Sequence, residues 1–421
     1  MVIGRLSKKY ILDLLICLLL VTPQLQVYII NLGVDSYLVL LALLGGFFIF
    51  DLFRGEVVVF RKILLFYVIM LFFVIGIVFI QVVINEQYSF YSHLRGVLGR
   101  EEAHIAFGRT DYIEKTLVAS ELLRFIAVFI LGFLMFYYLS KKDGDDLLRF
   151  FLFIFAAASV FQIFYVLLYA LGGLEWFINI AMGGATAAHF SEGVTGARFG
   201  LVRFPGGFSE PSFMAVVLFS SLYSFALGLY FKAAPIRLRG TLFLVVSSGF
   251  IFLTTASIIM VFVFLFAFYL FLMGARGWRF KLVLSCMFFL VVFLQVLPFV
   301  FEGVQVPKGM ESIIVRQFLV SDVSKLTNFS LIFGFAFAQV YNFPVLNNLI
   351  LQLGVLGALG LGVSFSMLGR FGGWLFILFV FVLSLSPNLI YSFNYLAIAF
   401  ALSVVCVYWR GGYDSKITKE E

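Results

Sequence analysis

The chain has 421 residues, of which 63% are hydrophobic and only 12% are charged, and its net charge is +7. Soluble domains carry about 25% charged residues and about 45–50% apolar ones. The composition therefore excludes a cytosolic enzyme, a disordered protein and a nucleic-acid binder, and the 57 Phe residues favour helices that face lipid. We expect an all-α, polytopic integral membrane protein.

Membrane-spanning helices need about 20 predominantly apolar residues each. The segments that meet this criterion are Tyr10–Ile30, Val34–Phe50, Ile63–Ile84, Leu122–Leu139, Leu147–Leu171, Phe213–Phe231, Leu282–Phe301, Val345–Leu368, Trp374–Ile390 and Asn394–Trp409. The stretch Thr241–Met273 is too long for one helix, and its small polar residues Thr254–Ser257 predict a turn between two short helices. The sequence thus predicts about twelve transmembrane helices in a single membrane domain, residues 1–421.

The distribution of basic residues predicts the orientation of these helices. With about twelve spans, most of the 29 Lys and Arg residues fall in short loops on the side that also holds both termini. Short loops rich in Lys and Arg are cytoplasmic, so we predict cytoplasmic termini in the inner membrane of a bacterium. The long external segments are then about 85–121, 172–211 and 302–344. Because long loops in compact proteins are usually functional, we expect the site in the second and third of them, together with short helices.

Metal and disulfide chemistry is not indicated. The three cysteines (Cys17, Cys286 and Cys406) lie inside apolar runs, and the chain has only three histidines. Neither a disulfide framework nor a multi-histidine metal site follows from this pattern. We therefore expect no metal and no other cofactor.

The second long external segment carries the most specific pattern, RFPGGFSEPSFMA, which begins at Arg203. Pro211 suits the first turn of a helix, where its missing N–H has no partner to lose. Glu210 then lies at the start of that helix, with Arg203 and Arg198 nearby in the sequence. The pattern fits two interpretations equally: a helix cap with a stabilising ion pair, or a carboxylate and arginines that perform chemistry.

This pattern resembles the bacterial O-antigen and exopolysaccharide polymerase (Wzy-type) family and the related O-antigen ligases. The residues that match R-x-x-G-x-F-x-[E/N]-P-[S/N] are Arg203, Gly206, Phe208, Glu210, Pro211 and Ser212. The ending Glu-Pro-Ser resembles the exopolysaccharide-type members more than the ligases. The layout of about a dozen helices with extended periplasmic loops is also similar to that of the family.

A second family signature has a weaker counterpart in the third long segment. The residues that correspond to it are Arg316, Phe333-Gly334-Phe335, Asn347-Asn348, Leu353-Gly354 and Gly357. Two positions differ, because Asn347 replaces the usual histidine and Gln352 replaces the usual acidic residue. With no imidazole base at position 347, Glu210 is favoured as proton acceptor and the ligase interpretation is weakened.

The resemblance implies a metal-independent glycosyltransferase that moves a glycan from undecaprenyl pyrophosphate onto an undecaprenyl-pyrophosphate-linked repeat unit at the periplasmic face. Arginines suit a pyrophosphate leaving group because their planar forks pair with developing negative charge, and a carboxylate can accept the proton of the attacking hydroxyl. The expected catalytic residues are Arg203, Glu210 and Arg316. The expected substrate-binding residues are Arg198, Arg124, His189, Asn347 and Asn348. Expected partners are the lipid-linked donor and acceptor, membrane lipids and a chain-length regulator protein.

Alternatives remain open at several of these positions. Arg316 and Arg124 are also suited to binding lipid headgroups, and a single loop histidine such as His189 is commonly only solvated. A flippase or transporter of lipid-linked glycans would also use about twelve helices. Transporters usually show internal repeats and ionisable residues near the bilayer midplane, whereas the predicted spans here are nearly free of charge. The transferase interpretation is therefore preferred.

Overall fold

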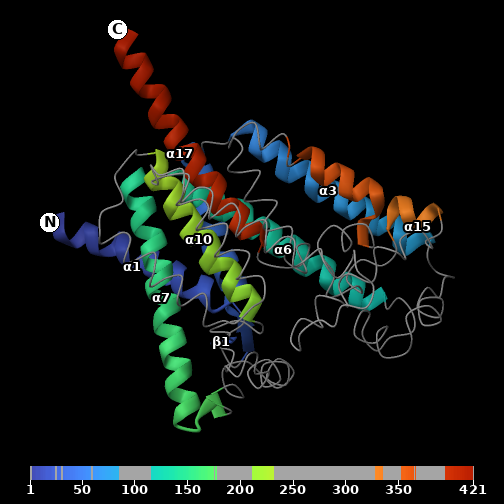
Figure 1. Cartoon of the computed structure of the whole chain (residues 1–421), viewed down its shortest axis with the longest axis horizontal. Helices are drawn as coiled ribbons and strands as arrows, with labels where there is room; N and C mark the ends of the chain where they lie inside the picture. Colours follow the sequence, from blue (N-terminus) through green and yellow to red (C-terminus); the bar gives the residue numbers. More distant parts are fainter. Residues whose placement is uncertain are drawn as a thin grey trace, which may run out of the picture. The chain divides into compact units, whose positions relative to one another are not determined.

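The structure is a computed structural model, and it describes residues 2–23, 26–29, 32–57, 60–84, 115–174, 176–177, 211–231, 328–334, 352–364, 366 and 394–420. Most of these residues are helical (Figure 1). The elements are α1 (Val2–Val21), β1 (Gln26–Ile29), β2 (Leu32–Asp35), α2 (Ser36–Phe53), α3 (Arg61–Ile84), α6 (Lys115–Ser140), α7 (Gly144–Ala170), α10 (Pro211–Phe231), α15 (Asn328–Phe333) and α17 (Asn394–Glu420), with a further helix at Gln352–Ser364. The predicted spans Leu282–Phe301 and Trp374–Ile390, and the stretch Thr241–Met273, lie outside the described residues.

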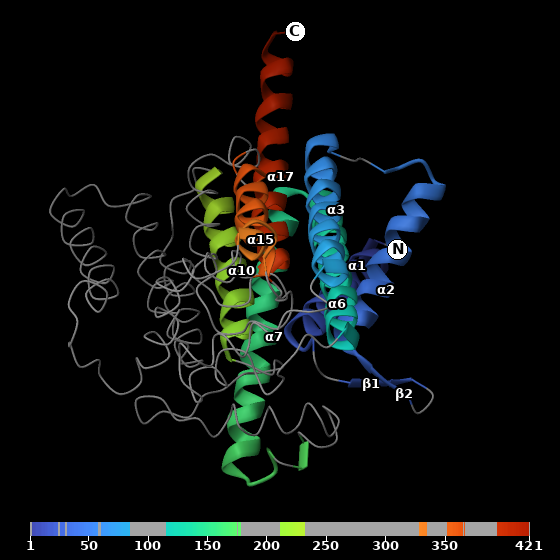
Figure 2. The same cartoon turned by 90° about the vertical axis from the view of Figure 1, so that its right-hand side faces the viewer.

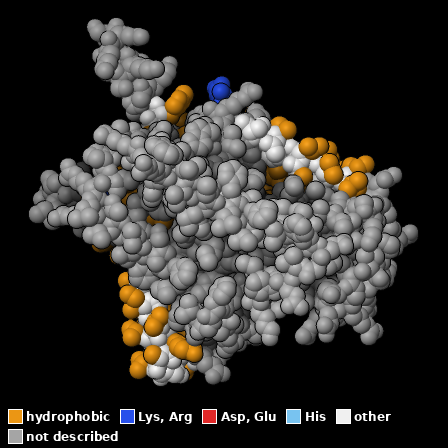
Figure 3. Space-filling model, viewed as in Figure 1, with side chains coloured by type: hydrophobic (Ala, Val, Ile, Leu, Met, Phe, Trp, Pro, Cys, Tyr) orange, Lys and Arg blue, Asp and Glu red, His pale blue; other side chains and the backbone are white. Residues whose placement is uncertain are grey.

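Four of the described helices are long and apolar enough to cross a membrane. These segments are Ser36–Phe53, Arg61–Gln81, Leu122–Ser140 and Gly144–Ala170, and each overlaps a span predicted from the sequence. Large apolar side chains are exposed along them, among them Phe72 and Phe79 of α3 and Val160 and Leu167 of α7. Figure 3 shows such apolar side chains in orange on the surface of the described helices. An extended apolar surface of this kind is suited to lipid rather than water. The helical membrane-protein class is therefore supported, while the count of about twelve spans stays a prediction.

The first predicted span is wrong in its second half. The sequence predicted a helix over Tyr10–Ile30, but α1 ends at Val21, two residues before Pro23. Proline disfavours helical geometry in the residue before it, which accounts for the early end. The following residues pair as an antiparallel hairpin, with Gln26 opposite Asp35 and Ile29 opposite Leu32. Tyr and β-branched residues in this segment favour strand geometry.

Local signals explain the ends of the other helices. The Asp143 side chain accepts a hydrogen bond from the Asp146 N–H at 2.8 Å and so caps the start of α7. Gly55 and Gly172 have φ values of +69° and +70°, and each follows the end of a helix, where a left-handed glycine is common. Helix α6 begins at Lys115, earlier than the predicted start at Leu122.

The described elements belong to two compact units. The first contains α1, the β1–β2 hairpin, α2, α6 from Ile130 onward, α7, α10 and nearly all of α17. In this unit α7 contacts both α1 and α10 (Figure 2). Helix α17 packs on α7 through Phe400 and Phe151, whose rings meet edge to face with centroids 5.9 Å apart. The core of this unit is thus built from apolar and aromatic contacts between helices.

The second unit contains α3, α6 up to Phe129, α15 and the helix Gln352–Ser364. Its buried centre is aromatic: Phe129 lies 5.1 Å from Tyr67, 5.5 Å from Phe125 and 5.0 Å from Tyr395, measured between ring centroids. Edge-to-face and offset contacts of this kind stabilise a core beyond the area they bury. Helix α15 lies against α3 in this unit.

Candidate functional site

Most of the residues assigned to the site by sequence lie outside the described part of the chain. These residues are Arg198, Arg203, His189, Glu210, Arg316, Asn347 and Asn348. What the structure does describe is the helix that follows the first motif. Helix α10 begins at Pro211, as the Glu210-Pro211 pair predicted, and it continues to Phe231. Glu210 is therefore the residue immediately before an apolar helix.

Arg124 is the one predicted substrate-binding residue that the structure describes. It lies near the start of the apolar part of α6 and is half-buried. An arginine there can extend its charged end toward the headgroup region while its methylene groups stay against the helix. The position suits a contact with either a lipid headgroup or the donor phosphate.

Two glycines of the second motif meet directly. Gly334, directly after α15, has φ +80°, and Gly354 has φ +71°. A Cβ atom on Gly334 would lie 2.6 Å from the carbonyl carbon and oxygen of Gln352. A Cβ on Gly354 would overlap the backbone of Ile332 and Gly334. Both glycines are thus required by backbone conformation and by the close approach of two chain segments.

A residue that the sequence interpretation missed joins these two segments. Gln81 of α3 donates from Nε2 to the carbonyl oxygens of Phe333 at 2.7 Å and Gln352 at 2.5 Å. Its side chain is buried, with 3% of its surface exposed. We call Gln81, Gly334 and Gly354 the glycine junction. The sequence does contain a signal that could have pointed to Gln81, because it is the single carboxamide in the apolar helix α3. Polar residues in such spans usually form hydrogen bonds to neighbouring helices.

Replacing Gly354 by Ala is expected to destabilise the protein strongly. A left-handed conformation alone costs an L-residue about 1–2 kcal/mol, and the overlap with the Ile332 backbone adds to it because no side-chain rotation relieves it. Gly362 lies in the same helix, and a Cβ there would meet no atom within 4 Å. Gly362→Ala is the matched control and is expected to be neutral or stabilising. Thermal melting of the detergent-solubilised variants, followed by size-exclusion chromatography, should separate the two; equal melting temperatures would contradict the observed junction.

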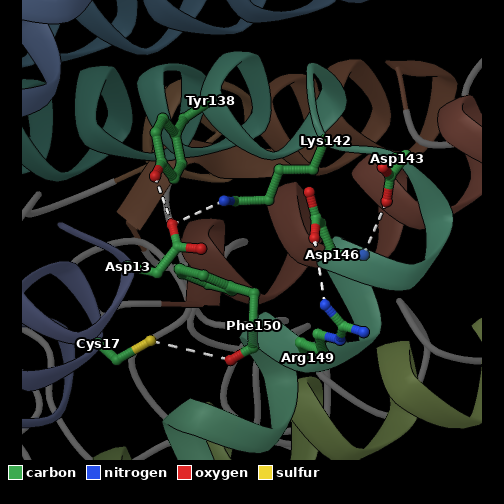
Figure 4. A network of polar contacts seen from close by, with 8 residues as sticks. All are labelled: Asp13, Cys17, Tyr138, Lys142, Asp143, Asp146, Arg149 and Phe150. Carbon is green, nitrogen blue, oxygen red and sulfur yellow. Dashed lines mark hydrogen bonds and ion pairs between the residues drawn. The ribbon is translucent and has the colours of Figure 1, made fainter. Parts of the chain in front are cut away.

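A second polar cluster links α1 to the turn between α6 and α7 (Figure 4). Lys142 Nζ lies 2.6 Å from Asp13 Oδ1, and the Tyr138 hydroxyl donates to the same oxygen at 2.5 Å. The lysine and aspartate side chains are only 5% and 4% exposed. Lys142 also lies 4.6 Å from the ring centroid of Tyr138, within range of a cation–π contact. We call these three residues the buried trio.

The residues one position earlier, Tyr137 of α6 and Lys141 of the α6–α7 turn, repeat the arrangement with another helix. Lys141 Nζ lies 2.6 Å from Asp51 Oδ2 of α2, and the Tyr137 hydroxyl donates to that oxygen at 2.9 Å. The ion pair is less buried here, with side-chain exposures of 33% for Lys141 and 18% for Asp51, although Tyr137 itself is buried. We call Lys141, Asp51 and Tyr137 the second trio. Partial burial by itself lowers the pKa of the Lys141 ammonium, but the hydrogen bonds and charges of Asp51 and Tyr137 together outweigh it and hold that pKa above its usual range.

The two trios are relevant to the predicted orientation of the helices in the membrane. They join α1 at Asp13 and the last turn of α2 to the α6–α7 turn, within one unit. The charge pattern predicts that the flanks of these three places share a single, cytoplasmic face. The ion pairs are consistent with that common face, and they explain why two aspartates occur within apolar segments.

Comparison with known proteins gives no relative: no protein-family model, no curated protein and no solved structure matches the chain.

The remaining polar chemistry of the described residues is limited. Among them, no three His, Cys, Asp or Glu side chains lie together in a way that would hold a metal ion. Cys17 and Cys406 are buried free thiols, and the Cys17 Sγ lies 3.8 Å from the Phe150 carbonyl oxygen. The described features that lie next to the two sequence motifs are the start of α10 and the glycine junction.

Proposed function

We propose that this protein is a polysaccharide polymerase. In this proposal it transfers a glycan from undecaprenyl pyrophosphate onto an undecaprenyl-pyrophosphate-linked repeat unit at the periplasmic face of the inner membrane. The observation that carries the proposal is the pattern from Arg203 to Ser212, which ends where the apolar helix α10 begins at Pro211. A carboxylate and arginines next to a membrane helix suit a substrate whose reacting group is anchored by a lipid.

The chemistry assigned to each side chain follows from the reaction. As the glycosidic bond breaks, negative charge grows on the departing pyrophosphate, and Arg203 and Arg316 pair with it. Glu210 accepts the proton of the attacking sugar hydroxyl. Arg198, Arg124, His189, Asn347 and Asn348 hold the donor and acceptor. In this mechanism the arginines perform the charge stabilisation that a divalent cation supplies in other glycosyltransferases.

The described spans favour a transferase over a flippase. Transporters place ionisable residues near the bilayer midplane. In α2, α3, α6 and α7 the charged residues lie toward the ends of the apolar segments, as with Asp51, Arg61, Arg124 and Arg149. Asn347 at the usual histidine position favours a polymerase over a ligase.

Deletion of the gene, followed by complementation with Glu210→Gln, tests this function. Gln keeps the shape and much of the capping ability of Glu but cannot accept a proton, so the variant is expected to abolish long-chain glycan while single repeat units accumulate. Glu56→Gln, at an exposed position after α2, is the matched control and should restore normal polymer. Extracted glycans are compared on gels at equal protein levels by immunoblot.

Other outcomes would assign a different function. Long glycan that is made but not joined to its lipid acceptor would indicate a ligase. Repeat units that accumulate on the cytoplasmic face would indicate a flippase. Normal polymer in Glu210→Gln would leave Glu210 as a helix cap and remove it from the mechanism.

A further inference from the structure

We propose that the end of α2 binds the headgroup of an anionic phospholipid, with Arg54 contacting the phosphate and Phe50 and Phe53 lying beside the acyl chains. We call these three residues the α2-end site. It involves none of the residues assigned to glycan transfer.

The last two turns of α2 expose large apolar side chains. Ile49, Phe50 and Leu52 are each more than half exposed, and Phe53 is 86% exposed. Of the four apolar spans that the structure describes, α2 is also the least buried. Its 18 residues give a length of about 27 Å, close to the thickness of the hydrocarbon core. Phe53, the last residue of α2, therefore lies at the depth where acyl chains give way to headgroups.

Backbone hydrogen bonds close this end of the helix and leave the Arg54 side chain free of a capping role. Gly55, with φ +69°, donates its N–H to the Leu52 carbonyl at 3.1 Å, and the Glu56 N–H donates to the Asp51 carbonyl at 3.0 Å. This pair of bonds around a left-handed glycine is a Schellman motif. The motif fixes the direction in which the chain leaves α2, and so it fixes the position of Arg54.

The Arg54 guanidinium is held in place by an aromatic ring. Its Cζ lies 4.2 Å from the centroid of the Phe50 ring, within range of a cation–π contact. In the part of the chain that the structure describes, no side chain forms a hydrogen bond or ion pair with this guanidinium. Asp51, one turn earlier, is bonded to Lys141 and Tyr137 instead. The planar fork is thus positioned to bind a phosphate group at two points.

The charges around the site favour an anionic lipid over a zwitterionic one. The chain from Asp51 to Lys62, together with Lys141, contains an excess of basic over acidic residues: Arg54, Arg61, Lys62 and Lys141 against Asp51 and Glu56. Basic residues close to a membrane surface attract anionic headgroups. A zwitterionic headgroup also carries an ammonium, which this excess of positive charge repels. The expected occupant is therefore a lipid with net negative charge, such as phosphatidylglycerol.

The test places a fluorescent reporter at the site in the full-length chain. The four native tryptophans are replaced by Phe, and Phe53→Trp introduces a single reporter next to Arg54. The purified protein is reconstituted into phosphatidylcholine vesicles that contain increasing fractions of brominated phosphatidylglycerol or brominated phosphatidylcholine, which quench a neighbouring tryptophan. We expect phosphatidylglycerol to bind about fivefold more tightly, the effect of one basic side chain near the membrane surface.

Two variants of this reporter chain test the assigned contacts. Arg54→Gln removes the charge and the fork, and the preference for phosphatidylglycerol should fall below about twofold. Phe50→Leu keeps an apolar side chain but removes the ring that holds the guanidinium, and it should lower the preference about twofold. The matched control is Arg149→Gln, at another exposed arginine, whose guanidinium already donates to the Tyr10 hydroxyl at 2.9 Å. It should keep the preference of the parent chain.

Soluble glycerol phosphate distinguishes a lipid site from a site for free phosphate. It should not reduce quenching by phosphatidylglycerol, because it lacks the acyl chains that contact Phe50 and Phe53. Competition by glycerol phosphate would overturn the assignment to a lipid.

Three other results would overturn the site: equal binding of the two lipids by the parent chain, an unchanged preference in Arg54→Gln, or an equal loss in Arg149→Gln, which would indicate overall charge instead of one site. None of these measurements uses transfer activity. A failure of the polymerase proposal therefore leaves the lipid-binding result intact, and the reverse also holds.

Discussion

Asp13→Asn is expected to destabilise the folded protein by about 3–5 kcal/mol, because it leaves the buried Lys142 ammonium without its carboxylate. The same change at Asp51 is expected to cost about 0–1 kcal/mol, since the Asp51–Lys141 pair is partly exposed. The two trios have the same composition and nearly the same distances, with 2.6 Å between lysine and aspartate in both. The burial of the lysine–aspartate pair is therefore the main variable that differs between them.

The measurement is the thermal stability of detergent-solubilised Asp13→Asn and Asp51→Asn, compared with the parent chain. A double variant, Asp13→Asn with Lys142→Met, removes both charges and should recover much of the lost stability, because an apolar replacement of a buried pair is often neutral. Equal effects of the two aspartate changes, or a double variant that is worse than Asp13→Asn, would contradict the interpretation of the buried trio as a charge pair.

Arg203→Lys and Arg316→Lys are each expected to reduce polymer formation by about 30- to 1000-fold. Lysine keeps the positive charge but loses the planar fork that contacts a phosphate at two points. A contact of this type contributes about 2–4 kcal/mol to the transition state, which gives that range of rates. Protein level and membrane insertion should be unchanged, because both residues lie in segments predicted to be external.

The comparison requires a matched arginine outside the proposed site. Arg61, exposed at the start of α3, serves for this purpose, and Arg61→Lys should leave polymer length and amount as in the parent chain. Variants are expressed in the deletion strain, matched by immunoblot and compared by gel of the extracted glycan. Normal long-chain polymer from both Arg203→Lys and Arg316→Lys at normal protein levels would remove the arginines from the mechanism.

The long apolar helices followed from the sequence because membrane thickness imposes a length and an apolar composition that any window of residues reveals. The segments of α2, α3, α6 and α7 were located in this way, and Pro211 marked the start of α10. The same criterion failed at α1, where apolar residues continue past Pro23 but form strands instead of helix. Hydropathy does not distinguish an apolar strand from an apolar helix; here Pro23 and the Tyr and β-branched residues after it account for the strands.

What the sequence by itself determined is the class of the molecule, a helical membrane protein, and the motif residues that carry the proposed chemistry. What only the tertiary structure decided is which polar side chains meet. Asp13 pairs with Lys142 across 129 positions, and Gln81 bonds Phe333 and Gln352 across 252 and 271 positions. Local periodicity carries no information about such distant partners. In an apolar environment a buried polar group must find a partner, and the packing of the helices determines which one it reaches.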